Sequence, residues 1–446
     1  MTLNTEFLSA IKATLGDDFD GYLSSLENEA FRGLRVNRLK ADNSILSHLD
    51  FECTPSQFSP DGYYIDNGIK SLGNHPLHHA GAFYLQEPSA MSAVTALDVQ
   101  SHDRVLDLCA APGGKSTQIA SALQGTGLLI SNEIVPARAK ILCQNIERMG
   151  AKNAIVTCAR PDELEQYLEG FFDKILVDAP CSGEGMIRRE PNAIVEWKFE
   201  NRQMCADRQL KILKSADKML KAGGVLVYST CTLSEDENEQ VIDKFIKSHP
   251  YYEIDEITAQ FGRCAYVRFA DNPDIVKARR ILPQDKGEGH FVARLKKSEH
   301  TGENYEISPE NSDTNPIFDE FLNQNFIGIT GNIQIYRDNV SILPSGIPIL
   351  RGIHILRAGV QAGMLKKNRF EPSHAIYMSQ SPENIKNVLD LNLDNTQIYD
   401  FLRGYEIDCD KKGYTAVSVC GVTVGFGKAS AGRLKNHYPK GLRILK

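Results

Sequence analysis

Several features that would place a protein in a special class are missing from this chain of 446 residues. It contains no run of about 18 apolar residues, and its first residues do not pair a cationic stretch with an apolar core. We therefore expect a cytoplasmic protein that neither enters a membrane nor carries a secretion signal. Its ten cysteines form no CxxC pair and no dense cluster, which disfavours a zinc site and a disulfide framework. Reduced thiols and no bound metal are expected.

An excess of positive charge is also missing, since 57 acidic residues outnumber 50 lysines and arginines and leave a net charge of −7. This balance argues weakly against a polyanionic partner, but the charges are unevenly distributed. Residues 299–320 hold seven acids and no lysine or arginine among Gly, Ser, Asn and Pro, a composition typical of a linker. Residues 411–446 hold eight lysines or arginines and no acid, which suits contact with an RNA backbone, although a solvated face is the alternative.

Length and pattern together divide the chain into four expected regions. Residues 1–75 suggest a small α+β module, in which the basic residues of the segment 34–41 either face phosphates or lie on a solvated strand. Residues 76–298 alternate strand-like and helix-like segments. The acidic linker 299–320 follows, and residues 321–446 form a β-rich region that includes the basic end.

The alternation in the middle region predicts a doubly wound α/β sheet with mostly parallel strands. Strands are expected to begin at Arg104 and to cover residues 128–132, 154–157, 172–180, 225–231 and 290–297. The helix from residue 207 to residue 224 is expected to stop at Gly223 and Gly224, because glycine commonly ends helices. Ser234 and Glu237 have the spacing of a capping box and should therefore start the next helix.

An acid and a thiol stand where one of these predicted strands ends. Asp178 and Cys181 follow the apolar run 175–177, and the carboxyl edge of an open α/β sheet is where ligands bind. Cys231 ends the next strand, so the two thiols should converge across the crevice at that edge. The simpler alternative at each position is a small buried thiol without a function.

A turn in the same region has the composition of a nucleotide site. Residues 113–117, GGKST, resemble the end of a P-loop, but that pattern requires glycine where Cys109 stands, and the pattern GxGxxG is absent. What remains is a turn of small residues, 110–114, with Glu133 placed at the end of the next strand to accept hydrogen bonds from ribose hydroxyls. An adenosine ligand without pyrophosphate fits this combination, and S-adenosylmethionine is the obvious candidate.

Three motifs give the chain a resemblance to a known family. The segments LDLCAAPGGKST, DAPCSGEGM and VYSTCTLSEDENE resemble, in order and spacing, signature motifs of the Sun/Nop family of RNA 5-methylcytosine methyltransferases. Upstream, RVNRLK at 35–40 and GAFYLQEPSA at 81–90 extend the similarity. Residues 425–443 resemble the C-terminal RNA-binding module of the bacterial RsmF-like branch, which modifies small-subunit (16S) ribosomal RNA. The resemblance implies a Rossmann-like class I S-adenosylmethionine methyltransferase sheet between a small N-terminal α+β module and a β-rich, PUA-like C-terminal domain.

The resemblance also implies roles for individual residues. Cys231 would act as the nucleophile with Cys181 assisting, and Asp178 would contact the methyl donor or the target base. The residues expected to bind S-adenosylmethionine are Cys109, Ala110, Ala111, Pro112, Gly113, Gly114, Lys115, Glu133, Arg138 and Asp178. Those expected to bind RNA are Arg35, Lys40, Arg433, Lys435, Lys440 and Arg443. The family often has an acid just after the third strand, where this chain has residues 157–160 followed by Asp162.

The chemistry of cytosine gives an independent reason for two thiols and an acid. Carbon 5 of cytosine is a poor nucleophile, so a thiolate must first add to carbon 6. An acid must protonate or hydrogen-bond ring nitrogen 3 as charge develops there. Asp178 is better placed for this than Asp107, which lies inside the first strand. We expect a monomeric enzyme that methylates small-subunit ribosomal RNA through a covalent cysteine–cytosine intermediate. Transfer RNA as the substrate, a P-loop-like nucleotidase and a non-catalytic RNA-binding protein are the alternatives.

One aromatic residue has two possible interpretations at this level. Trp197 is the single tryptophan of the chain. It should either stack on a base of the RNA or pack against other apolar side chains. The sequence does not decide between these two expectations.

Overall fold

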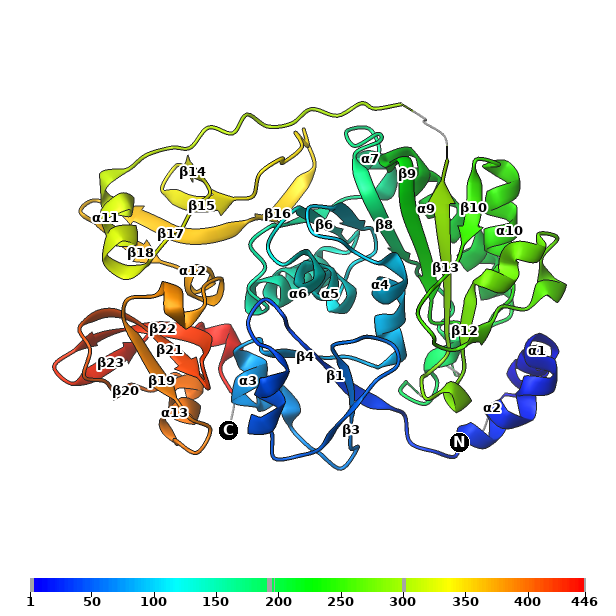
Figure 1. Cartoon of the computed structure of the whole chain (residues 1–446), viewed down its shortest axis with the longest axis horizontal. Helices are drawn as coiled ribbons and strands as arrows, with labels where there is room; N and C mark the ends of the chain where they lie inside the picture. Colours follow the sequence, from blue (N-terminus) through cyan, green and yellow to red (C-terminus); the bar gives the residue numbers. More distant parts are fainter. Residues whose placement is uncertain (1–3, 191–194, 196, 299–301, 445–446) are drawn as a thin grey trace.

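The structure is a computed structural model that describes residues 4–190, 195, 197–298 and 302–444. A large central sheet with helices on both faces occupies the middle of the molecule, and the N-terminal and C-terminal modules lie against it (Figure 1). The described chain has no helix that is long and apolar enough to span a membrane. Nor do the histidines, cysteines and acids of that part form a group suited to holding a metal ion.

The N-terminal module consists of a helix pair and a small antiparallel sheet. Helices α1 (Thr5–Leu15) and α2 (Phe19–Ser25) pack against the central region, where Phe7 and Ile11 share a core with Trp197 and Leu282. The sheet has the order β2-β3-β1-β4, with bounds Cys53–Pro55, Gly62–Ile65, Arg32–Val36 and Phe83–Leu85, and α3 (Pro76–His79) precedes β4. Because β4 pairs with β1, this sheet extends past residue 75, where the sequence suggested that the module ends.

The central sheet has ten strands in the described chain, in the order β11-β12-β13-β9-β8-β5-β6-β7-β16, with β10 paired to β13. The bounds of its strands are β5 Arg104–Asp107, β6 Leu128–Asn132, β7 Ala154–Cys158, β8 Phe172–Asp178, β9 Leu220–Thr230, β10 Tyr252–Asp255, β11 Arg263–Cys264, β12 Arg279–Ile281, β13 His290–Lys297 and β16 His354–Ala358. The ladder from β7 through β6, β5 and β8 to β9 is parallel, and β13 runs antiparallel beside β9. The helices of this region are α4 Ser92–Leu97, α5 Gly114–Leu123, α6 Pro136–Arg148, α7 Pro161–Leu164, α9 Glu200–Met219 and α10 Glu239–Ser248. The predicted doubly wound, mostly parallel sheet is confirmed.

The predicted end of the helix before the fifth strand of this region is wrong. Helix α9 ends at Met219, and Gly223 and Gly224 lie inside β9. The register between β8 and β9 shifts after the pair Phe172 and Leu220, so the glycines lie in an irregular stretch of strand rather than at a helix end. Gly223 has a φ of +71°, a conformation that glycine adopts without strain.

The predicted capping box of the following helix is also wrong. Helix α10 begins at Glu239. The residue at its N-cap is Asn238, and the Asn238 side chain makes no capping hydrogen bond. Glu237 does not turn back to the helix, because its carboxylate accepts hydrogen bonds from Ser182 in the loop that follows β8 and from Gln209 of α9. Glu237 therefore stabilises the loop after β8 and does not cap helix α10.

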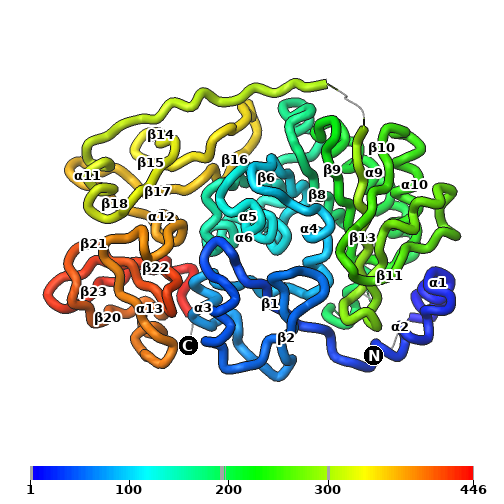
Figure 2. Tube along the Cα trace, in the orientation of Figure 1, coloured from blue at the N-terminus to red at the C-terminus, as the bar shows by residue number. Residues whose placement is uncertain are grey.

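The C-terminal region has two β-rich parts. An extended segment, residues 302–315, crosses the top of the molecule, and α11 then begins inside the range expected for the linker (Figures 1 and 2). The first part consists of α11 Pro316–Asn325, β14 Asn332–Tyr336, β15 Asn339–Leu343, β17 Val360–Lys366, β18 Arg369–Pro372 and α12 His374–Met378. The second consists of β19 Val388–Leu391, α13 Gln397–Arg403, β20 Ile407–Asp408, β21 Gly413–Val419, β22 Val422–Ser430 and β23 Arg433–Asn436. The expected β-rich C-terminal domain is confirmed.

Two long-range connections join this region to the rest of the molecule. Strand β16 pairs antiparallel with β7, so the C-terminal region supplies an edge strand of the central sheet. Leu34 and Phe83 of the N-terminal sheet share a core with Phe401 and Val417 of the last part. The two terminal modules are therefore packed together beside the central sheet.

Candidate active site

The two thiols singled out by the sequence lie next to each other. Cys181 follows β8 and Cys231 follows β9, and because these strands are paired in parallel, both residues stand at the carboxyl edge of the sheet. Their sulfur atoms are 3.3 Å apart. The hydrogen bond to Cys231, together with burial, raises the pKa of the Cys181 thiol well above its usual value. Cys181 therefore stays protonated near neutral pH and can donate its S–H to the Cys231 sulfur.

Asp178 ends β8 at the same edge and is held by two side chains. Its Oδ2 accepts a hydrogen bond from Lys115 Nζ at 2.8 Å, and its Oδ1 accepts one from Ser229 Oγ at 2.8 Å. Burial lowers the pKa of Lys115, but the negative charge of Asp178 and its hydrogen bond to Lys115 outweigh burial, so the net direction is upward. Lys115, in the first turn of α5, is therefore a cation that interacts with Asp178 and with the charge of an ionised Cys231.

Glu237 holds the loop that carries Cys181. Its Oε2 accepts a hydrogen bond from Ser182 N at 3.0 Å, and its Oε1 accepts one from Ser182 Oγ. Gln209 of α9 donates to the same carboxylate at 3.0 Å and to the Pro180 carbonyl at 3.1 Å. Burial raises the pKa of Glu237 to about 7. Sequence reasoning missed this role, and the only available signal was its place in the motif that also carries the second thiol.

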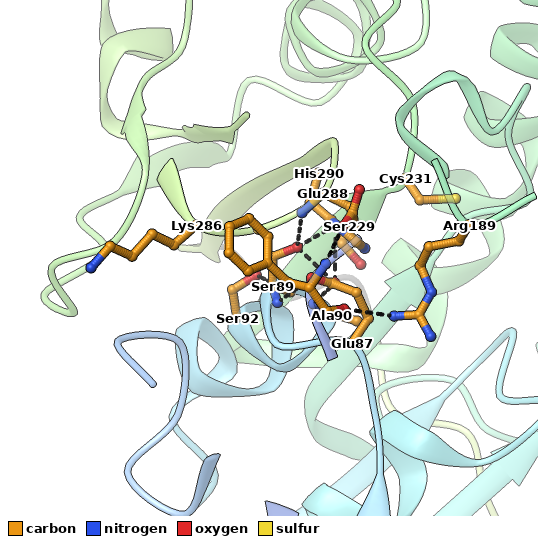
Figure 3. A network of polar contacts seen from close by, with 12 residues as sticks. Glu87, Ser89, Ala90, Ser92, Arg189, Ser229, Cys231, Lys286, Glu288 and His290 are labelled. Atoms are coloured by element: carbon orange, nitrogen blue, oxygen red, sulfur yellow. Dashed lines mark hydrogen bonds and ion pairs between the residues drawn. The ribbon is translucent and has the colours of Figure 1, made fainter. Parts of the chain in front are cut away.

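A buried polar network ties the segment 86–90 to the central sheet near these groups (Figure 3). Ser89 Oγ donates to Glu87 Oε2 at 2.7 Å, lies 2.9 Å from His290 Nδ1 and accepts from Glu288 N at 3.1 Å. Burial lowers the pKa of His290 to about 3, so its ring is neutral, and the charges of the Lys115 ion pair also act on it. The network therefore borders the edge where the thiols lie and fixes the N-terminal module against it.

The small-residue turn after β5 is held by α6. Arg138 Nη2 donates to Ala111 O at 2.8 Å, and Asn145 Nδ2 donates to Pro112 O at 2.8 Å. Gly113 has a φ of +116°, and a Cβ at this position would lie 3.1 Å from a leucine methyl group of α6. The turn thus depends on glycine for both its conformation and its close approach to the helix. All the residues expected to contact the cofactor between 109 and 115 lie on this turn or at the start of α5.

Two buried acids border the turn. Glu133 follows β6 and is 3% exposed, and its Oε1 accepts from Val135 N at 2.9 Å while its Oε2 lies 3.4 Å from Arg138 Nη1. Asp107 Oδ2 accepts from Ser116 Oγ at 2.7 Å, whereas its buried Oδ1 has no hydrogen-bond partner within the described chain. Burial raises the pKa of Asp107 to about 7. A buried polar atom without a partner beside a turn of small residues indicates a place for a ligand.

Four family models match successive parts of the chain. The model described as 16S rRNA methyltransferase RsmB/F matches residues 94–296, and that of the N-terminal domain of 16S rRNA methyltransferase RsmF matches residues 3–88. The model of the first C-terminal domain of RsmF rRNA methyltransferase matches residues 318–379, and that of the RsmF PUA domain matches residues 388–444. The matches therefore extend over almost the whole chain.

Curated relatives agree with these matches. Ribosomal RNA small subunit methyltransferase F of Shewanella piezotolerans is 32% identical over 475 residues, which cover 98% of this chain and 97% of that protein. The protein of the same name from Vibrio vulnificus is 30% identical over 462 residues, which cover 98% of this chain and 96% of that protein. The chain belongs to the RsmF family of 16S ribosomal RNA methyltransferases.

Two solved structures share the fold of this RsmF-family chain. A methyltransferase homologue from Pyrococcus horikoshii is 27% identical with a TM-score of 0.58, and the match covers 66% of this chain and 100% of that one. NSun6 from the same organism, solved with SFG, is 22% identical with a TM-score of 0.59, covering 66% and 98%. The predicted Rossmann-like class I methyltransferase fold with a PUA-like C-terminal domain is confirmed.

S-adenosylmethionine is the cofactor of the RsmF family, and the residues of this chain fit it. The residues of the turn 110–114 have small side chains, so little bulk would separate its backbone from a ligand. Glu133, buried at the end of β6, offers a carboxylate to ribose hydroxyls, and Asp107 Oδ1 is an acceptor without a partner among the described residues. These groups suit an adenosine moiety, and Lys115 is engaged by Asp178 rather than directed at a phosphate cradle.

The C-terminal residues that the sequence suggested for RNA binding differ in their surroundings. Lys435 and Lys440 are exposed and form no ion pair with any residue that the structure describes. Arg433 is paired with Asp408, and Arg443 donates to a backbone carbonyl at 3.4 Å. The two lysines are therefore the side chains best able to contact phosphates.

The N-terminal residues suggested for RNA binding are used inside the protein. Arg35 is buried, and its guanidinium donates to Gly114 O at 2.9 Å and to Thr117 Oγ1 at 2.8 Å. Lys40 Nζ donates to Thr423 O at 2.8 Å, and burial lowers its pKa to about 7. The expectation that Arg35 contacts RNA is wrong, because the residue is buried and supports the start of α5. Lys40 joins the N-terminal module to the C-terminal domain.

Two further residues considered from the sequence are placed by the structure. Trp197 is 7% exposed, its Nε1 donates to Glu184 Oε1 at 2.8 Å, and its ring packs edge-on against Phe7 at a centroid distance of 5.3 Å. It is therefore a packed residue whose ring also lines the cavity next to Cys181. Asp162 is exposed and pairs with Arg160 at 2.7 Å.

Proposed function

We propose that this RsmF-family enzyme methylates carbon 5 of a cytosine in 16S ribosomal RNA through a covalent bond between Cys231 and the base. The observation that carries the proposal is the 3.3 Å contact between the sulfur atoms of Cys181 and Cys231, beside the ion pair of Asp178 and Lys115. Methylation of an amine or a hydroxyl group would need no pair of thiols, because those groups are nucleophiles themselves. We also propose that the enzyme acts as a monomer in the cytoplasm.

Cys231 is the proposed nucleophile because a hydrogen-bond donor contacts its sulfur and the charge of a nearby cation acts on it. The cation is Lys115, and the donor is the S–H group of Cys181. The Cys231 thiolate attacks carbon 6 of the cytosine, and the ring becomes an enamine whose carbon 5 is nucleophilic. Negative charge develops on nitrogen 3 during this addition. A proton taken from solvent and carried by Asp178, which Lys115 and Ser229 hold in place, neutralises nitrogen 3 and returns to Asp178 when the base is released.

The cofactor is proposed to lie between the turn after β5 and the end of β6. Residues 109–115, Glu133, Arg138 and Asp178 would hold S-adenosylmethionine, which supplies a methyl group bonded to a positively charged sulfur. Glu133 would accept hydrogen bonds from ribose hydroxyls, and Arg138 would keep the Glu133 carboxylate and the Ala111 carbonyl in place. The same sheet edge then presents both the cofactor turn and the thiols.

Cys181 is proposed to act when the product is released. Its proton is retained while the neighbouring sulfur carries negative charge. Once Cys231 is bonded to carbon 6, its sulfur is neutral and no longer adds to the effect of burial on the Cys181 pKa, so Cys181 can pass its proton to water. The Cys181 thiolate then takes the proton from carbon 5, directly or through a water molecule. The electron pair of that C–H bond restores the double bond between carbons 5 and 6, and Cys231 leaves as a thiolate.

Bisulfite sequencing of RNA from a strain without this protein tests the proposal. We expect a cytosine of 16S ribosomal RNA to lose its protection from conversion, and wild-type protein but not Cys231→Ser to restore it. A change confined to transfer RNA would replace the proposed substrate. Unchanged cytosines in both classes of RNA would contradict cytosine-5 methylation.

A further inference from the structure

Helix α9 borders a cavity that begins at one of the thiols. The cavity has a volume of about 270 Å³, and its lining includes Cys181 together with Asn201, Met204 and Arg208 of α9. Met204 is 57% exposed, and Phe199, immediately before the helix, is 47% exposed. Large apolar side chains left in water beside a polar site commonly mark a binding surface. The flexible thioether of Met204 is also suited to packing against a flat ring.

Positive charge continues along the same side of α9. Arg208, Lys211 and Lys214 are spaced three residues apart, which keeps them on one side of the helix. All three are exposed, and none forms an ion pair within the part of the chain that the structure describes. They line a second hollow of about 390 Å³, and Arg208 belongs to both hollows. A continuous surface therefore leads from the Cys181 thiol to a row of cations.

The acids near this row are already engaged. Asp207 accepts a hydrogen bond from Gln203 Nε2 at 2.8 Å, and Glu165 pairs with Lys218 at 2.7 Å. Asp162, which also lines the second hollow, is held by its arginine partner. The cations of the row are therefore available to an anion from outside the chain.

We propose that this face of α9 binds the RNA strand directly next to the target nucleotide. The neighbouring base enters the cavity against Met204, and the phosphates that follow it contact Arg208, Lys211 and Lys214. This inference rests on the proposed function, since it assumes that the target base reaches the two thiols. It identifies α9 as a part of the enzyme that reads or positions the sequence beside the modified cytosine.

RNA is the proposed occupant because the chemistry at both ends of this surface suits an RNA strand. One end is the Cys181 thiol, which in the proposed reaction handles an RNA base. The other end carries cations with no ion-pair partner in the described chain, and a phosphate backbone supplies the matching charge at regular intervals. An apolar residue between these ends suits a stacked base, because bases expose flat faces of any sequence.

A photoreactive side chain at the cavity tests the placement of the base. Met204→p-benzoylphenylalanine, irradiated with small ribosomal subunits from a strain without this protein, should crosslink to RNA. Mass spectrometry should locate the crosslink on a nucleotide adjacent to the methylated cytosine. A crosslink to a ribosomal protein, to a distant nucleotide, or to nothing while the variant still methylates RNA would overturn the proposal.

Removal of the cations tests whether they bind phosphates. The double variant Arg208→Ala, Lys211→Ala should raise KM for RNA several-fold while kcat at saturating RNA and S-adenosylmethionine affinity stay near wild type. The slope of log affinity against log salt should become shallower by about 0.7 for each phosphate of single-stranded RNA that the variant no longer neutralises. Lys244→Ala is the matched control, because Lys244 is an exposed lysine of α10 without an ion pair in the described chain. Equal slopes for the double variant and the control would overturn the proposal.

These experiments distinguish a failure of the inference about α9 from a failure of the proposed function. If wild-type enzyme produces no 5-methylcytosine, the proposed function fails. If wild-type enzyme methylates cytosine while the double variant matches the control in KM and salt slope, only the role of α9 fails.

Discussion

Glu237 and Ser182 connect the two loops that carry the thiols. The N–H and the hydroxyl group of Ser182 both donate to the Glu237 carboxylate, and the Ser182 hydroxyl lies 2.8 Å from Thr232 Oγ1. Ser182 follows Cys181 in the chain, and Thr232 follows Cys231. The hydrogen bonds between these neighbours therefore fix the separation of the two sulfur atoms. The geometry of the thiol pair therefore depends on the Glu237 carboxylate.

Removal of this carboxylate should lower the rate of methylation. Glu237→Ala leaves the Ser182 N–H and the Gln209 amide without an acceptor, which costs about 1–3 kcal/mol for a buried group. We expect kcat for methyl transfer to fall at least about tenfold, which corresponds to about 1.4 kcal/mol in the barrier. Calorimetric affinity for S-adenosylmethionine should not change. Wild-type kcat in Glu237→Ala would exclude a positioning role for this residue.

The titration of Glu237 should be visible in protein stability. Burial raises its pKa from 4.5 to about 7 in the folded protein. A carboxyl group with a raised pKa contributes stability that is fully present below pH 4.5 and is lost as the pH rises through about 7. Relative to Glu237→Gln, the free energy of unfolding of the wild-type protein should therefore fall by up to roughly 3 kcal/mol across this pH range. Thermal unfolding of both proteins at about pH 5 and about pH 8 measures the difference in their stability. The same difference at both pH values would contradict the prediction.

The sequence was sufficient to predict the convergence of the thiols. The apolar runs before Asp178 and Cys231 are short and buried, and neighbouring parallel strands bring their carboxyl ends to one edge. The glycine turn and Glu133 could be predicted for the same reason, because each follows a strand of the same sheet. These predictions needed only local patterns and the rules of parallel sheets.

The remaining features depend on contacts between distant segments. The pairing of β16 with β7 joins residues that are nearly 200 positions apart, and neither strand carries a signal for the other. Arg35 was expected on the surface because its segment is basic, yet the first residues of α5 supply it with carbonyl and hydroxyl acceptors. Glu237 has the spacing of a cap, but Ser182 offers two donors that the helix end does not. Tertiary hydrogen bonds override the local pattern at these positions.

The buried acid at the end of β6 should contribute to cofactor affinity. Glu133→Ala would leave the hydroxyl groups of the bound ribose without their acceptor and should weaken S-adenosylmethionine binding by about 1–3 kcal/mol. Asp162→Ala is the matched control, because Asp162 is exposed and its carboxylate pairs with Arg160. Isothermal titration calorimetry should show wild-type affinity for the control. An unchanged affinity in Glu133→Ala would remove this residue from the cofactor site.

The exposed lysines of the C-terminal domain should contribute to RNA affinity. Lys435→Glu and Lys440→Glu together should weaken binding of 16S ribosomal RNA and make the slope of log affinity against log salt shallower by about 0.7 for each single-strand phosphate that is no longer neutralised. Cofactor affinity should stay at the wild-type value, because the two lysines belong to the PUA-like domain rather than to the central sheet. Filter binding across a range of salt concentrations measures the slope, with Lys244→Glu as the exposed control. Slopes that match this control would show that the lysines do not contact phosphates.

The most direct test of the proposed reaction is electrophoresis of the thiol variants with RNA under denaturing conditions. If Cys231 attacks carbon 6 and Cys181 acts only in release, Cys181→Ser should still bond to the base and accumulate a covalent protein–RNA complex. Cys231→Ser should form no complex, because a hydroxyl group is a far weaker nucleophile than a thiolate near neutral pH. The double variant should form none either. A complex that accumulates with Cys231→Ser and is absent with Cys181→Ser would contradict the assignment and make Cys181 the nucleophile.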